Sequence, residues 1–306
     1  MPRVVWFLIA SLVVCGCSIK RMAINSMADS LAGSSDVYAS DEDPELVREA
    51  LPFALKTIES LLAQVPQHQG LLVSAASGFT QYAYAFVWLD AEEIENTDSV
   101  AAKQLRERAR LLYLRARNYG LRALDVTEPD FSERINQDLD AVLKKMKQSD
   151  VPALYWTAVS WAAAVSQAKG NMDLVADLPA VDAMIRRALE LQENYDSGAI
   201  HEFLISYESG RAGGSLEKAR EHFARAMEIN GGKKIAPLVS LAENISVQNQ
   251  DRKEFLELLE RALSFDVNSA EKNRLANLIA QKRARQLKAR IEDLFLDNVE
   301  EQEESQ

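Results

Sequence analysis

Apolar residues recur every three or four positions from residue 44 to about residue 296, the spacing of one buried face of a helix. No run alternates in the way that a half-buried strand would require. The pattern therefore predicts an all-α domain over 44–296. Its expected helices are 44–63, 67–90, 100–125, 130–147, 152–168, 177–192, 197–209, 215–229, 234–248, 251–264 and 268–296.

Three-residue patterns repeat in the second helices of successive predicted pairs. They are Ala219, Phe223 and Ala226; Phe255, Leu259 and Ala262; Val181, Ile185 and Ala188; and, more weakly, Ala109, Tyr113 and Ala116. The spacing is that of a tetratricopeptide (TPR) repeat, in which a small residue lets two antiparallel helices approach closely. We expect a helical-hairpin, TPR-like repeat array forming a right-handed α-solenoid. A generic helical bundle is the alternative.

The first residues have the features of a cleaved leader. One arginine precedes an apolar run of about eleven residues, which is too short to span a bilayer as a helix. The segment Val14 to Cys17 resembles the bacterial lipobox, which implies a signal peptide at 1–16 and a lipid on Cys17. Ser18 and not Asp follows the cysteine, which resembles the default sorting of such lipoproteins to the outer membrane, so we expect the protein to be anchored there, facing the periplasm. An ordinary signal peptide is the alternative.

Two further segments flank the predicted domain. Residues 17–43 are polar with a weak helical pattern, so we expect a lipidated tether with a short helix. Residues 297–306 are acidic and polar, and are predicted to be a disordered tail. A helix start is expected where acidic residues precede Pro44.

Composition and charge limit the fold classes and the classes of binding partner that we expect. Glycine and proline total only 12 and 8 of 306 residues, which favours helices over turn-rich sheets, and the net charge is −11. The densest basic run, 282–290, has helical spacing and is predicted to be a solvated helix face. Nucleic acid is therefore not expected as a partner.

Sequence motifs for catalysis are missing. The three histidines, His68, His201 and His222, are isolated along the sequence, and both cysteines lie in the leader region. The paired glycines near 213 and 231 lack the rest of a phosphate loop, and are better explained as a helix start at Ser215 and a helix stop at Gly231. We expect no enzyme activity, metal site or cofactor.

Aromatic residues supply the binding candidates. Tyr84 and Trp88 belong to a dense aromatic segment and are candidates for lining a ligand cavity. Candidates for contact with a partner protein lie on predicted first helices: Tyr155, Trp156, His201, Glu202 and Tyr207. For each of them internal packing is the alternative.

Long stretches of the chain resemble one family. They include Asp43-Pro44-Glu45-Leu46-Val47, Gln81-Tyr82-Ala83-Tyr84-Ala85-Phe86-Val87, Asp150-Val151-Pro152-Ala153-Leu154-Tyr155-Trp156, Asp196-Ser197-Gly198-Ala199-Ile200-His201-Glu202-Phe203-Leu204 and Asn273-Arg274-Leu275-Ala276-Asn277-Leu278-Ile279-Ala280-Gln281. The body is similar to the TatT component of tripartite ATP-independent periplasmic (TRAP) transporters, whose members are helical, lipidated and built from cryptic TPRs.

The resemblance implies an accessory role in transport. It implies binding of the periplasmic TRAP substrate-binding protein, uptake of a small hydrophobic or carboxylate ligand, and a trimer with a pore through each subunit as in some members. Three alternatives remain: a TPR-type lipoprotein scaffold for cell-envelope assembly, an enzyme acting on envelope polymers, and a direct carrier of a hydrophobic ligand.

Overall fold

The computed structural model describes residues 22, 24–33, 35–168 and 172–296, so the predicted signal peptide, Cys17 and the acidic tail lie outside it. Every regular element in these ranges is helical, which confirms the all-α prediction. Residues 24–32 are helical, and the named helices follow. They are α2 (Ser35–Ala39), α3 (Pro44–Leu62), α4 (Gln69–Ala83), η1 (Tyr84–Trp88), α5 (Leu89–Ile94), α6 (Ser99–Thr127), α7 (Phe131–Arg134), α8 (Leu139–Lys144), η2 (Gln148–Asp150), α9 (Val151–Ser166), α10 (Met172–Ala176), α11 (Leu178–Leu191), η3 (Tyr195–Ser197), α12 (Ala199–Gly210), α13 (Leu216–Asn230), α14 (Ala236–Leu241), η4 (Ala242–Ser246), α15 (Arg252–Leu263), η5 (Val267–Asn273), α16 (Arg274–Ala289) and α17 (Ile291–Leu294).

Several helix ends follow from local sequence. The Asp43 carboxylate accepts hydrogen bonds from the backbone N–H groups of the first turn of α3, which has Pro44 at its start. Ser215 caps α13 in the same way, and Gly231 ends it with a positive φ of 60°. The predicted start at Ser215 and stop at Gly231 are therefore both confirmed.

One predicted helix, 130–147, is wrong, because the structure breaks it into α7 and α8. The break includes Asn136 and Asp138, whose short polar side chains compete with the helical backbone. Arg187 on α11 donates to the carbonyl oxygens of Leu143 and Met146 at 3.1 and 3.0 Å, so α8 ends against α11.

Two other predicted segments differ in detail. The segment 67–90 continues through the π-helical turn η1 into α5, and 268–296 is divided into η5, α16 and α17. The positions identified as repeats are interior: Val181, Ile185 and Ala188 are fully buried, as are Phe255, Leu259 and Ala262. The TPR-like solenoid arrangement and its right-handed sense stay predictions.

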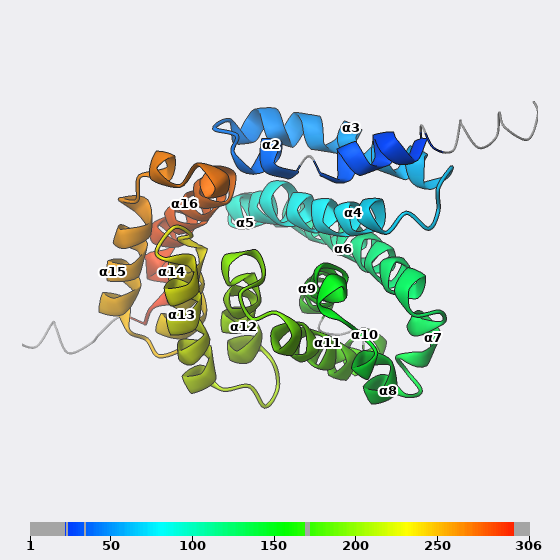
Figure 1. Cartoon of the computed structure of the whole chain (residues 1–306). Helices are drawn as coiled ribbons and strands as arrows, with labels where there is room; N and C mark the ends of the chain where they lie inside the picture. Colours follow the sequence, from blue (N-terminus) through cyan, green and yellow to red (C-terminus); the bar gives the residue numbers. More distant parts are fainter. Residues whose placement is uncertain (1–21, 23, 34, 169–171, 297–306) are drawn as a thin grey trace, which may run out of the picture.

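The helices follow one another around a ring, so that the C-terminal helices come to lie beside the N-terminal ones (Figure 1). The main core extends from Ala28 to Tyr207, and a second core is built from Ile205 to Phe295. A small apolar cluster joins the two ends, with Val47, Phe86 and Leu89 packed on Ile279. Arg274 also donates to the Ser40 carbonyl oxygen at 2.9 Å, which fixes the segment before α3 on α16.

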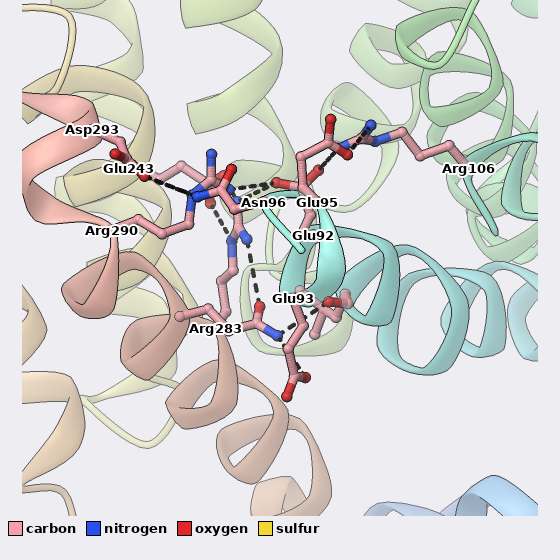
Figure 2. Close-up of polar contacts among 11 residues, drawn as sticks. Glu92, Glu93, Glu95, Asn96, Arg106, Glu243, Arg283, Arg290 and Asp293 are labelled. Atoms are coloured by element: carbon pink, nitrogen blue, oxygen red, sulfur yellow. Dashed lines mark hydrogen bonds and ion pairs between the residues drawn. The ribbon is translucent and has the colours of Figure 1, made fainter. Parts of the chain in front are cut away.

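A polar clasp completes this closure (Figure 2). Arg283 on α16 makes a two-pronged ion pair with Glu243 on η4, and lies 3.6 Å from Glu92 on α5. Glu92 also pairs with Arg290 at 3.3 Å and with Arg106 on α6 at 3.0 Å. The basic run 282–290 was predicted to be a solvated face. The prediction is wrong for Arg283, whose side chain is only 4% exposed.

We predict that Arg283→Ala destabilises the fold by about 3 kcal/mol, because it leaves Glu243 and Glu92 without their shared buried cation. Arg285→Ala is the matched control, since Arg285 is exposed two residues further along the same helix. Chemical denaturation followed by circular dichroism measures both. Equal stability of the two variants would show that the clasp does not hold the ring closed.

Candidate functional site

The two predicted cavity residues, Tyr84 and Trp88, lie on the π-helical turn η1. Their rings stack with centroids 5.6 Å apart, and the Arg283 guanidinium carbon lies 4.8 Å from the centre of the Trp88 ring. A π-helical turn adds a residue to the helix and turns its neighbours to a new direction. The second π-helical turn of the described chain, η4, carries Glu243. Both π-helical turns therefore supply residues that surround Arg283.

Tyr84 is partly exposed, but its surroundings are desolvated. Its side chain is 39% exposed. Loss of water around it nevertheless raises the pKa of its phenol well above the ordinary value, with charges on Glu243, Glu202 and Glu92 adding to the rise and Arg283 opposing it. A side chain on a convex surface would keep its hydration and its pKa. Partial exposure together with desolvation therefore places Tyr84 among other parts of the protein and not on a protruding surface.

Glu202 on α12 acts on Tyr84 from another wall of the same site. Burial raises the pKa of its carboxyl group, Lys234 lowers it, and Asp196 raises it further. The Lys234 ammonium is occupied by Asp196, with 2.6 Å to the backbone oxygen and 3.2 Å to the carboxylate. Within the described ranges the Glu202 side chain has neither a hydrogen bond nor an ion pair, while its backbone N–H donates to the Gly198 carbonyl oxygen.

Two more tyrosines reach this space. Burial raises the pKa of Tyr155 on α9, with Glu202 adding to the rise, and burial raises the pKa of Tyr113 on α6, with Tyr84 adding to it. Tyr155 and Tyr113 are 8% and 3% exposed. Neither hydroxyl has a hydrogen-bond partner in the described part of the chain, and neither oxygen is among the fully buried polar atoms without one. The small exposed part of each side chain therefore includes its hydroxyl group.

We call the site formed by Tyr84, Tyr113, Tyr155 and Glu202 the central recess. Its residues come from η1, α6, α9 and α12, which are distant in sequence, and the charges of the clasp residues Glu243, Arg283 and Glu92 act on Tyr84. The site presents phenol hydroxyls, aromatic faces and one carboxyl group. It is suited to holding a small molecule by hydrogen bonds and ring contacts.

The predicted partner-binding residues do not all lie together. Tyr155 and Glu202 belong to the central recess, and Trp156 packs edge-on against Tyr155 with ring centroids 5.0 Å apart. Tyr207 lies elsewhere, stacked on Phe203, and its hydroxyl is 3.5 Å from the Leu178 carbonyl oxygen. Of the five, Trp156 and Glu202 are partly exposed, and the others are buried. Contact of these residues with a partner protein stays a prediction.

The description of His201 and His222 as isolated histidines is wrong in three dimensions. The Nδ1 atoms of His201 on α12 and His222 on α13 are 2.8 Å apart, and Nε2 of His201 lies 3.2 Å from Glu193. Burial lowers the pKa of both histidines, and that of His222 falls to about 4. The two residues are 21 positions apart, so only helix packing brings them together. No group of three or more side chains suited to a metal ion occurs in the ranges that the structure describes.

One further depression, of about 420 Å³, opens at the turn between α6 and α7. It is lined by Gln67, Asp125, Val126, Pro129, Asp130, Ser132 and Glu133, and it contains none of the predicted residues. None of the described helices has the length and apolar character needed to cross a membrane.

The described residues form an all-helical protein whose two ends pack together. Comparison with protein families gives a match to the TRAP transporter T-component over residues 40–295, so the chain belongs to this family of transporter accessory components. The chain is also 32% identical over 317 residues to an uncharacterized protein of Treponema pallidum (strain Nichols), covering 96% of this chain and 98% of that protein.

The histidine pair predicts a specific pH dependence of stability. The pKa values of both histidines are lower in the folded chain than the value near 6.5 that they have in the unfolded chain. As the pH falls, the unfolded chain therefore binds more protons than the folded chain. The free energy of unfolding is highest near neutral pH and decreases toward a pH of about 4. Glu193 and Arg225 face His201, and Glu208, Arg186 and Lys218 face His222. We expect His222→Gln to lose less unfolding free energy than the wild type between these pH values.

Urea denaturation at a series of pH values measures this difference. An unchanged slope of unfolding free energy against pH in His222→Gln would contradict the prediction.

Proposed function

We propose that the protein is a lipid-anchored T-component that holds the soluble substrate-binding protein of a TRAP system near the membrane, and that its central recess contacts the transported ligand. The observation that carries the proposal is the match to the TRAP transporter T-component family over residues 40–295. The hydroxyl groups of Tyr84, Tyr113 and Tyr155 support it, because they have no protein partner in the described part of the chain and are not fully buried, so they are open to hydrogen bonds with a ligand.

The anchor contributes by restricting diffusion. The membrane-attached protein keeps its bound partner close to the membrane. The ligand site of the partner then stays at high effective concentration beside the central recess. The closed ring contributes rigidity, since a preformed surface limits the ordering cost of binding. The polar groups of the central recess favour a ligand with a polar group over a purely hydrophobic cargo, which would displace water from the Glu202 carboxyl group and leave that group without a partner.

The anchor predicts that Cys17→Ala moves the protein from the membrane fraction to the soluble fraction, because a thioether-linked lipid needs the Cys17 sulfur. Cell fractionation and immunoblotting measure the distribution. Cys15→Ala is the matched control and should stay with membranes. Retention of Cys17→Ala in the membrane pellet at the wild-type level would refute the anchor.

The proposed interaction predicts that the tagged protein captures a TRAP-type substrate-binding protein from periplasmic extract. Mass spectrometry identifies the captured protein. Trp156→Ala should reduce the captured amount at least about tenfold, since aromatic side chains dominate many interfaces. Phe53→Ala is the aromatic control, because Phe53 is highly exposed on α3 and is not a predicted contact.

Circular dichroism establishes that both variants are folded. Absence of a substrate-binding protein from the wild-type capture would contradict the proposed function. Equal capture by Trp156→Ala would contradict the assignment of the contact surface alone.

A further inference from the structure

The N-terminal helix, residues 24–32, is packed onto the folded body at the connection between α3 and α4. Ala28 in this helix is 0% exposed and belongs to the main core. The Asp29 carboxylate lies 3.1 Å from Nε2 of His68, and a Cβ atom added at Gly70 would lie 3.2 Å from the Ala32 Cβ. The helix is therefore part of the body, and only the residues that precede it connect the body to Cys17.

The length of this connection limits how far the body can lie from a membrane. Cys17 and Met22 are five residues apart, so a lipid on Cys17 lies within about 18 Å of Met22 even if the chain between them is fully extended. A free tether formed by all of residues 17–43 would allow about 90 Å by the same estimate. The anchor therefore holds the start of the N-terminal helix close to the bilayer surface.

Two apolar side chains project from the helix at this end. Met22 is 67% exposed and Met27 is 53% exposed. Ser26 and Ser30, which helical spacing places between them on the helix surface, are exposed and uncharged. Apolar side chains on such a helix enter the boundary between headgroups and acyl chains, and the flexible methionine side chain adapts to an irregular surface. This face is therefore suited to contact with lipid.

The charges of the segment also suit a lipid surface. The charged side chains of residues 17–35 are Lys20, Arg21 and Asp29, and Asp29 lies beside His68. The whole chain, in contrast, has a net charge of −11. Anionic headgroups attract lysine and arginine next to a membrane anchor. The segment that follows Cys17 is therefore repelled by such a surface less than the rest of the chain.

We propose that the N-terminal helix of the anchored protein lies against a lipid bilayer, with the side chains of Met22 and Met27 inserted at the headgroup boundary. This inference rests on the proposed function, in that it takes Cys17 to carry the lipid anchor. Figure 1 shows α12 across the ring from α3 and α4, so this contact leaves α12 remote from the membrane.

A fluorescent label at position 27 tests the contact. The leader that contains Cys15 is removed and the lipid occupies the Cys17 sulfur, so the cysteine of Met27→Cys is the only free thiol of the mature lipoprotein. The protein is expressed from the full-length chain, labelled with nitrobenzoxadiazole, and reconstituted into vesicles of phosphatidylethanolamine and phosphatidylglycerol. The vesicles are prepared with and without brominated acyl chains, which quench only a label that reaches the bilayer.

Leu256→Cys is the matched control, because Leu256 is also an exposed apolar residue but lies on α15, whose buried residues belong to the second core. We expect brominated lipids to quench the label at position 27 at least about twofold more than the label at position 256. Met22→Asp should reduce the quenching at position 27, because a carboxylate opposes insertion, whereas Met22→Leu should preserve it. Thermal melting establishes that each variant is folded.

Flotation of the vesicles on a density gradient measures anchoring in the same samples. Protein that floats with equal quenching at the two positions, or without quenching at position 27, would overturn this inference and leave the proposed anchor intact. Protein that does not float would refute both the anchor and the inference. Unchanged quenching in Met22→Asp would contradict the insertion of Met22.

Discussion

The buried ion pair between Arg283 and Glu243 is the contact on which the rest of the structure depends. It connects α16 to η4, and through Glu92 it connects both to α5, about 190 positions earlier in the chain. Without that closure an array of helices would have two free ends and an open inner surface. With it, η1 and α12 are held close enough for the charge of Glu202 to act on Tyr84.

Closure also explains why polar groups can remain without partners inside the protein. Apolar packing at Val47, Phe86, Leu89 and Ile279 stabilises the ring independently of the recess. The fold can therefore tolerate the cost of a desolvated Glu202, which is the usual condition for a binding site. The π-helical turns at η1 and η4 belong to the same arrangement, since they aim Tyr84 and Glu243 where a regular helix would not.

Prediction from sequence succeeded where short-range physics decides. Asp43, Ser215 and Gly231 end helices in the way that their side chains or flexible backbone allow. It failed where distant packing decides, as at 130–147, where contacts of α8 with Arg187 compensate for a broken helix. The histidine pair belongs to the same class of failure, because nothing in a sequence fixes which helix faces pack together.

The sequence by itself determined the all-helical fold, the buried repeat positions and the aromatic character of the 79–88 segment, because helical periodicity and side-chain hydrophobicity are local properties. It also selected Tyr84, Trp88, Tyr155 and Glu202 as candidates without relating them to one another. Only the tertiary structure decided that Tyr84, Tyr155 and Glu202 share one recess while Tyr207 lies outside it. The physical reason is that desolvation and electrostatic coupling depend on distances across the closed ring, which the order of residues along the chain does not contain.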